Sequence, residues 1–251
     1  MPEAAKVTKD PFELRKLYKY LRVVDVADAM DGIGYFNIGL VSPEIKSLWL
    51  GMKFWGVALT LRCVPSNRPM WTLKTTAEMV DVHRIWFTEV GNVSIDKFIK
   101  PGSVIVTNTG STGEVGWWGS NNSLGCVAAG AVGIVTDGYC RDTYEVALQK
   151  TPICARTRGR TIIPGRIMAV EAQVTVDCGG AQVRPGDMVG CDDDGLLVVP
   201  QEVTEEVAHH AIAILLADMR GRRRLYDRLK MAHDETVDVE TVEAYYKGLK
   251  V

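Results

Sequence analysis

Short apolar runs alternate with helical segments through the middle of the chain, and this alternation is the strongest constraint on the fold. Each apolar run is too short for a helix and is followed by a segment with helical spacing or a polar start. Parallel strands with covering helices produce such a rhythm, so the sequence predicts an α/β fold. The predicted elements are a strand at 103–107, a glycine-rich loop at 110–120, a helix at 121–130, a strand at 132–137, a helix at 142–149 and a strand at 152–156.

The flanking segments follow other patterns. Alternating residues predict a strand at 54–63, followed by a helix or an irregular crossing at about 71–82. Short apolar runs separated by glycine and proline predict antiparallel or mixed β-structure at 162–200. Since no repeat or low-complexity linker interrupts the chain, we expect a single domain. Helical spacing recurs at 11–31, 201–230 and 239–248, so the predicted core is about 22–200, with helical extensions at 1–21 and 201–251.

Composition excludes several classes of protein. The 251 residues are 47% hydrophobic, enough for a sizeable core, and the net charge of −2 gives no overall attraction to nucleic acid or to a membrane surface. The six cysteines are dispersed without a C-x-x-C pair, which indicates reduced thiols. A secretory signal pattern and an apolar run of about 20 residues are both absent, so we expect a cytoplasmic location.

The stretch 130–145 (GAVGIVTDGYCRDTYE) brings charge to the end of a predicted strand. Gly138 is expected to end that strand, and the polar residues that follow lie where small ligands usually bind. The Asp142 carboxylate suits a hard divalent cation, and the Arg141 guanidinium suits an anionic substrate. An Asp142 that caps the next helix, with Arg141 paired to a nearby acid, explains the same spacing equally well.

The segment 116–125 (GWWGSNNSLG) can bind an anion, because glycines precede a predicted helix whose free N–H groups point outward. A helix start capped by Ser120 or Asn121 explains it equally well. The segment matches neither a Walker loop nor G-x-G-x-x-G, so nucleotide binding is unsupported. For Trp117 and Trp118 a place in a core or an interface is favoured over a role in shaping a substrate pocket.

Other polar clusters have ordinary structural explanations. The run 192–194 followed by Gly195 favours a hairpin turn over a metal site. The four histidines lack metal-ligand spacing and are given no ligand role. The basic residues within 220–230 could contact RNA or a neighbouring subunit's anionic substrate, but a solvated helix face is favoured. No nucleophile with its base is visible, so an enzyme of this sequence would depend on a metal for electrophilic chemistry.

Five blocks of the sequence, in order, resemble the RraA-like family over residues 22–230. That family includes class II pyruvate aldolases that cleave 4-hydroxy-4-methyl-2-oxoglutarate, non-catalytic regulators of ribonuclease E, and members mislabelled as demethylmenaquinone methyltransferases. The resemblance implies a three-layer β/β/α sandwich of the phosphohistidine swivelling-domain type, assembled as a homotrimer or homohexamer with active sites between subunits. The blocks are VVDVADAMDG, WGVALTLRC, PGSVIVTNTG, WWGSNNSLGCVAAGAVGIVTDGYCRDTYE and GGAQVRPGDMVGCDDDGLLVVP.

The aldolase members carry a glycine and then, about twenty residues later, R-D-x-x-E or D; Gly119, Arg141, Asp142 and Glu145 match. The resemblance implies that Asp142, with Glu145, belongs to a site for Mg²⁺ or Mn²⁺, and that Arg141 binds a 2-oxo acid and its developing oxyanion. Substrate-binding positions carried over in this way are Gly119, Ser120, Asn121, Asn122, Ser123, Leu124 and Arg141, with the backbone N–H groups of 121–124 around the substrate carboxylate.

One position departs from the aldolases. An acidic residue usually follows the glycine and contacts metal-bound water, but here Ser120 stands there. A second carboxylate normally comes from the C-terminal helix of a neighbouring subunit; Asp218 is the nearest match and Glu206 a weaker one.

The resemblance therefore implies a divalent-metal-dependent lyase that cleaves a 4-hydroxy-2-oxo acid and releases pyruvate, with oxaloacetate decarboxylation as a side activity. Two alternatives stay open. One is an enolate-forming reaction on another hydroxy or sugar acid, such as dehydration. The other is a non-catalytic protein that binds and inhibits a nuclease. Methyl transfer is discounted, because no G-x-G-x-x-G follows a strand.

Overall fold

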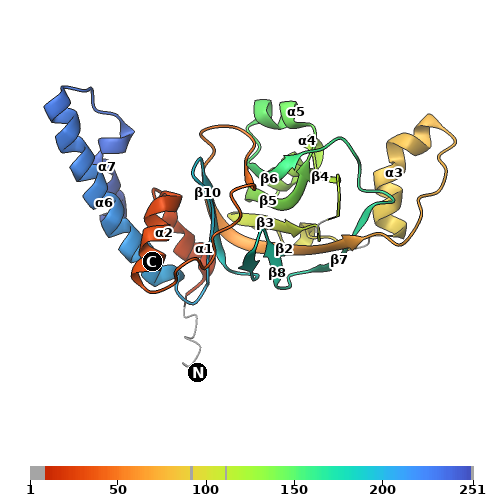
Figure 1. The fold of residues 1–251 in the computed structure, drawn as a ribbon, viewed down its shortest axis with the longest axis horizontal. Coiled ribbons are helices and arrows are strands. Elements are labelled where there is room, and N and C mark those ends of the chain that lie inside the picture. The colour runs from red at the N-terminus through yellow and green to blue at the C-terminus, as the bar shows by residue number, and fades with distance from the viewer. Residues whose placement is uncertain (1–8, 91–92, 111, 250–251) are drawn as a thin grey trace.

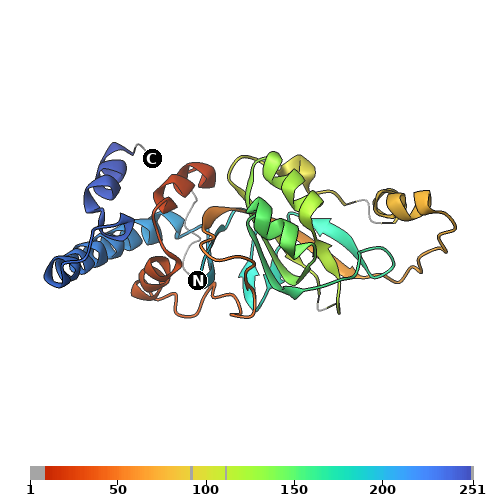
Figure 2. The ribbon, with the colours of Figure 1, turned by 90° about the horizontal axis from the view of Figure 1, so that it is seen from above.

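The computed structural model describes residues 9–90, 93–110 and 112–249. The molecule is elongated, with a helical cluster at one end, a central sheet, and helix α3 (Thr76–Glu89) projecting from the other end (Figures 1 and 2). This mixed α/β arrangement agrees with the predicted fold class.

A nine-stranded mixed sheet forms the centre. Its order is β1-β6-β5-β3-β2-β10-β11, with β4 added beside β5 and β7 beside β2. The pairs of β2 with β3, β3 with β5, β5 with β6 and β4 with β5 are parallel, whereas β1, β7, β10 and β11 pair antiparallel. The strands are β1 (Lys46–Ser47), β2 (Phe54–Pro65), β3 (Ser103–Asn108), β4 (Gly116–Trp118), β5 (Ala131–Cys140), β6 (Ile153–Arg158), β7 (Ile167–Ala172), β10 (Met188–Asp192) and β11 (Gly195–Val199).

Helices and a small second sheet cover opposite faces of the central sheet (Figure 1). Helices α4 (Ser120–Ala128) and α5 (Thr143–Gln149) share one apolar cluster with β2, β3, β5 and β6. The two-stranded sheet of β8 (Val176–Cys178) and β9 (Ala181–Val183) shares a second cluster with the same strands. The sequence predicted this α/β centre and the β-rich segment at 162–200. The specific swivelling-domain sandwich stays a prediction.

The two ends of the chain meet in a third apolar cluster. Packing of α2 against α6 dominates it, and Tyr18 donates a hydrogen bond from its hydroxyl to the Thr204 carbonyl over 2.7 Å. Trp55 of β2 joins this cluster to the sheet. Its elements are α1 (Pro11–Leu14), the 3₁₀ helix η1 (Arg15–Tyr18), α2 (Val23–Gly32), α6 (Thr204–Leu229), the 3₁₀ helix η3 (Glu235–Val237) and α7 (Val239–Gly248).

Two local predictions were wrong, and a third was right in kind but shifted along the chain. Strand β5 continues through Gly138 to Cys140, because the missing side chain there makes room for Thr109, whose nearest atoms would lie 2.8 Å from an added Cβ. The glycine-rich loop contains strand β4, which is stabilised by long-range pairing to β5. The helix or irregular crossing expected at about 71–82 is helix α3, which lies a few residues later and is started by a capping box between Thr75 and Glu78.

The acidic run is a hairpin turn, as predicted. Asp192 pairs with Gly195 at the β10–β11 turn. The carboxylate of Asp192 accepts from the Val23 N–H at 2.8 Å, and that of Asp193 accepts from the Gly51 N–H at 3.0 Å. These carboxylates are occupied by backbone amides.

The basic end of α6 contacts the C-terminal segments. Arg220 and Arg223 form ion pairs with Glu243 and Glu240 of α7, and Arg222 donates to the Thr236 carbonyl over 2.8 Å. Half of the basic set is thus bound within the chain. In the described ranges, no helix is both long and apolar enough to cross a membrane.

Candidate active site

Two parallel strands bring the predicted motif residues together. Trp118, the last residue of β4, pairs with Cys140, the last residue of β5. The chain continues from these strands into Gly119 and Arg141, and the Arg141 N–H donates to the Trp118 carbonyl over 2.9 Å. Because parallel strands end at the same edge, segments 119–124 and 141–145 lie at one mouth of the sheet.

Asp142 is held in an unusual backbone conformation. It occupies the N-cap position of α5 with a φ of +52°, in the left-handed region that Asp tolerates better than most residues. Its side chain makes no capping bond to α5. Instead its Oδ2 accepts from the Ser120 N–H at 3.0 Å and from the Ser120 hydroxyl at 3.2 Å. The capping explanation is therefore half right, since the position is the cap but the carboxylate bonds to α4.

Arg141 lies beside that carboxylate. Its Nε is 3.6 Å from Asp142 Oδ1, a separation for an ion pair rather than for a hydrogen bond. Both side chains are about one-third exposed, at 30% and 34%. Among the described contacts of the guanidinium, this is the one ion pair. Its other N–H groups are free to bind an anion.

Two backbone amides at the start of α4 have no hydrogen-bond partner among the residues that the structure describes. A helix leaves its first four N–H groups without intrahelical partners, here those of residues 119–122. The Gly119 N–H donates to the Asn122 side-chain oxygen at 2.8 Å, and the Ser120 N–H donates to Asp142. The Ser123 N–H donates to the Gly119 carbonyl at 3.2 Å and to the Asn122 side chain at 2.9 Å. Of the backbone N–H groups of 121–124 that were predicted to bind the substrate carboxylate, those of Asn121 and Asn122 are therefore the ones available.

Gly119 permits the close approach of the two segments. A Cβ at this position would lie 2.6 Å from Asp142 Oδ2 and 3.2 Å from Arg141 Cγ. Gly119 has a φ of −146°, so space, not backbone conformation, requires glycine here. It also takes the N-cap position that was expected for Ser120 or Asn121, and Ser120 is the first helical residue.

Of the remaining predicted acids, Glu145 lies at the same mouth of the sheet, whereas Asp218 and Glu206 lie on α6. Glu145 is exposed in the first turn of α5. Asp218, 55% exposed on α6, forms an ion pair with Arg22 at 2.9 Å, and Glu206 is exposed on the same helix. Helix α6 belongs to the helical cluster at one end of the molecule, whereas α4 and α5 lie over the central sheet (Figures 1 and 2).

The donor set suits a water-rich cation site. The described residues contain no group of three or more His, Cys, Asp or Glu side chains able to hold a metal. Mg²⁺, however, commonly takes one or two protein carboxylates and fills its shell with water and substrate oxygens. Oδ1 of Asp142 accepts no hydrogen bond among the described residues, and the Asp142 side chain is partly exposed, so this carboxylate fits the role.

His83 was missed by sequence reasoning. It is on α3, nearly sixty residues before the Arg141–Asp142 pair, and no local pattern linked the two. Burial lowers the pKa of the His83 imidazole below its ordinary value, the nearby Arg141 charge lowers it further, and Asp142 partly opposes this. The imidazole is therefore less readily protonated than an ordinary histidine, and its charge is coupled to that of the Arg141–Asp142 pair.

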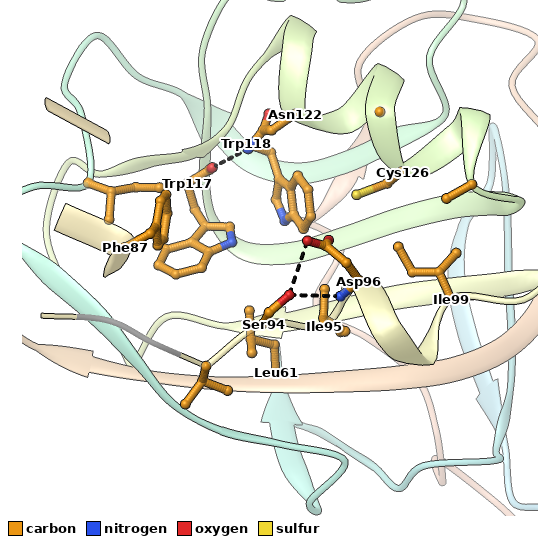
Figure 3. A pocket seen from close by; sticks show the side chains of 14 residues that line it. Leu61, Phe87, Ser94, Ile95, Asp96, Ile99, Trp117, Trp118, Asn122 and Cys126 are labelled. Carbon is orange, nitrogen blue, oxygen red and sulfur yellow. Dashed lines mark hydrogen bonds between the residues drawn. The ribbon is translucent and has the colours of Figure 1, made fainter. Parts of the chain in front are cut away.

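A pocket of about 570 Å³ adjoins the site (Figure 3). Trp117 and Trp118, both buried at 5% and 3% exposure, pack in the core as predicted and also form one wall of this pocket. Phe87 of α3 contacts Trp117 edge to face, with ring centroids 6.2 Å apart. Asn122 lines the pocket and donates from its amide to the Trp117 carbonyl over 3.0 Å.

Several known proteins resemble this chain. DlpA of Legionella pneumophila is 28% identical over 196 residues, covering 78% of this chain and 29% of DlpA. A Halalkalibacterium halodurans protein provisionally named 4-hydroxy-4-methyl-2-oxoglutarate aldolase is 35% identical over 40% of this chain and 47% of its own length. The chain thus spans less than half the length of these two relatives. A Deinococcus radiodurans protein with the same provisional name is 26% identical over 73% of this chain and 97% of its own length.

Solved structures show the same fold. An uncharacterised protein from Pseudomonas syringae superposes with a TM-score of 0.64 at 25% identity, covering 92% of this chain and 96% of its own. Streptomyces coelicolor RraAS2, described as an unusual member of the RNase ES inhibitor RraA family, superposes with a TM-score of 0.66 at 23% identity, covering 84% and 96%. The family model described as "RraA-like: Aldolase/RraA" matches residues 23–198. Since that match covers well over half of the sequence, this chain belongs to the RraA-like family.

Proposed function

We propose that this protein is a divalent-metal-dependent carbon–carbon lyase that cleaves a 4-hydroxy-2-oxo acid and releases pyruvate. The observation that supports this most is the Asp142 carboxylate, fixed by Ser120 on one oxygen and open on the other, beside an Arg141 guanidinium with free N–H groups. Family membership and the aldolase names of relatives point the same way.

The substrate's carboxylate end fits the start of α4. The free amides of Asn121 and Asn122 and the positive end of the helix dipole attract an anion. Arg141 offers a planar pair of donors to the same carboxylate and to the 2-keto oxygen. In this orientation the C3–C4 bond of the substrate lies on the side of the Arg141–Asp142 pair that is farther from the start of α4.

Cleavage leaves negative charge on the keto oxygen. The C4 hydroxyl loses its proton, the C3–C4 bond breaks, and its electron pair forms the enolate of pyruvate, which gains a proton at C3. Arg141 stabilises the enolate oxygen because its positive charge is already in place where charge develops. A divalent cation on Asp142 Oδ1, Mg²⁺ or Mn²⁺, would supply further Lewis-acid stabilisation.

The Ser120 substitution changes this site relative to the aldolases. Its hydroxyl donates to Asp142 over 3.2 Å and adds no charge. This hydrogen bond keeps the orientation of Asp142. The acidic group that the aldolases have at this position is missing, so a second carboxylate must come from another part of the assembly. We assign that role to Asp218 of a neighbouring subunit, in a trimer or a pair of trimers.

Pyruvate release tests the function. Wild type with Mg²⁺ or Mn²⁺ should release pyruvate from 4-hydroxy-4-methyl-2-oxoglutarate and from oxaloacetate, and EDTA should abolish both reactions. Asp142→Asn keeps the acceptor for Ser120 and tolerates the left-handed backbone, yet should lose at least about 100-fold in kcat/KM, and Arg141→Ala a similar factor. Normal turnover in both variants would refute the site. Absence of metal-dependent pyruvate from any substrate would instead favour another hydroxy-acid reaction or a nuclease-binding role.

A further inference from the structure

The pocket beside the site is built from five separate elements. Its wall includes Leu61 of β2, Phe87 of α3, Ile95, Trp117 and Trp118 of β4, and Gly125 of α4. The indole and phenyl rings face the interior of the pocket (Figure 3). About 570 Å³ is within the usual range of small-molecule sites. An aromatic-lined hollow of this size is far larger than the pyruvyl group requires.

Its position continues the substrate path. Trp117 and Trp118 directly precede Gly119, and Asn122 contributes both a wall of the pocket and one of the two free amides at the start of α4. The start of α4 and the pocket therefore share Asn122, and this shared residue is the basis for placing the distal end of a bound substrate in the pocket.

The charge of the pocket opposes a second carboxylate. None of the described residues that line it is Arg, Lys or His. The one charged side chain in the lining is Asp96, whose carboxylate accepts from the Ser94 hydroxyl at 3.0 Å and points inward (Figure 3). Asp96 is exposed to solvent, and a dianionic substrate would bring its distal carboxylate toward this negative group, so charge repulsion disfavours its binding.

We infer that this lyase, if the proposed function holds, takes 4-hydroxy-2-oxo acids whose C4 substituent is an uncharged aromatic or branched aliphatic group, and that this group binds in the pocket of Trp117, Trp118 and Phe87. The dicarboxylate 4-hydroxy-4-methyl-2-oxoglutarate is a poor substrate by comparison. A C4 phenyl substrate breaks at C3–C4 into benzaldehyde and pyruvate, with the hydroxyl proton lost from C4 and one proton gained at C3.

Gly125 offers a way to fill the pocket without disturbing the core. A Cβ added there meets no atom within 4 Å, and the residue lies inside α4, where leucine is a better helix former than glycine. Ala128, exposed on the same helix and outside the pocket lining, provides the matched control. Gly125→Leu therefore tests whether the substrate's C4 group occupies the pocket. Ala128→Leu tests the effect of the same side chain elsewhere on α4.

The experiment compares kcat/KM for 4-hydroxy-4-phenyl-2-oxobutanoate and 4-hydroxy-4-methyl-2-oxoglutarate, with oxaloacetate as a reference for enolate chemistry. We expect wild type to prefer the phenyl substrate by at least about ten-fold, the transfer free energy of a modest apolar group. Gly125→Leu should lower that preference by about ten-fold or more, and Ala128→Leu should leave it unchanged. Asp96→Asn should raise turnover of the dicarboxylate a few-fold at low salt.

Failure of the pocket assignment can be distinguished from failure of the proposed lyase function. Pyruvate from oxaloacetate or the dicarboxylate, without a phenyl preference or without an effect of Gly125→Leu, would overturn the pocket assignment and leave the lyase intact. If no substrate yields pyruvate, the lyase proposal fails, and a tryptophan-fluorescence titration with phenylpyruvate decides the pocket. Saturable quenching that Gly125→Leu weakens supports the pocket as an aryl site, and equal or absent quenching in both proteins overturns it.

Discussion

At the scale of single residues, the site depends on a missing methyl group. Gly119→Ala would place a Cβ 2.6 Å from Asp142 Oδ2, so the carboxylate must move away from Ser120. We expect turnover to fall by about ten-fold or more, since small displacements of catalytic groups are costly. Gly32→Ala, at the end of α2 and with no atom near its added Cβ, should keep activity and raise the stability of α2 slightly. Steady-state kinetics and thermal melts of both variants check this, and equal kinetics would contradict it.

Buried thiols predict how stability depends on pH. Burial raises the pKa of the Cys126 thiol from 9.0 to about 11 and that of Cys140 to about 12. The folded state favours the protonated thiol. The stabilisation that each protonated thiol contributes to folding is therefore complete below pH 9, and it is lost as the pH rises from 9 toward the raised pKa values. Each thiol should cost about 1.4 kcal/mol per pH unit over that window. Denaturant unfolding at pH 8 to 10.5 should show a shallower decline for Cys126→Ala; parallel curves would contradict the assignment.

At the scale of elements, close packing joins β10 to β2 and the helical cluster. A Cβ on Gly190 would lie 2.2 Å from the ring of its cross-strand partner Trp55. That indole also donates to the Leu21 carbonyl at 2.9 Å and packs on Tyr18 at 4.9 Å. We expect Gly190→Ala to destabilise the protein by about 1–3 kcal/mol. Gly221→Ala, in the open middle of α6, should instead stabilise it by about 0.5–1 kcal/mol, and urea titrations would compare the two.

At the scale of the whole molecule, the position of Asp218 makes a prediction about assembly. Because α6 belongs to the helical cluster at one end of the molecule and α5, which Asp142 precedes, lies over the central sheet, we expect Asp218 to act with Asp142 only between subunits. We expect light scattering to give a mass of three or six chains. Exposed apolar residues on α4 and α5 are suitable for such contacts: Leu124, Tyr144 and Leu148.

Mixed oligomers test the shared site directly. Asp142→Asn and Asp218→Asn should each be inactive alone, and co-expression with two affinity tags should restore part of the activity, because some interfaces then combine two intact residues. A substitution at Arg22, which forms an ion pair with Asp218, removes the same ion pair and so controls for a purely structural effect of Asp218→Asn. Activity of Asp218→Asn alone at the wild-type level would remove this residue from the site.

The sequence by itself determined the features that depend on local patterns. Alternating apolar runs predicted the α/β centre, helical spacing predicted α6 and α7, and the Asp-Gly turn predicted the β10–β11 hairpin. The R-D pair at the end of β5 was visible because it follows a strand directly.

Tertiary structure alone decided what depends on contacts between distant segments. Pairing of β4 with β5 carried the strand past Gly138, gave Asp142 its partner Ser120, and left two of the four α4 amides free. The approach of α3 placed His83 near Arg141 and closed the aromatic pocket with Phe87. A spacing pattern reports which face of an element is apolar, whereas these features depend on which elements meet, and that is fixed by packing over the whole chain.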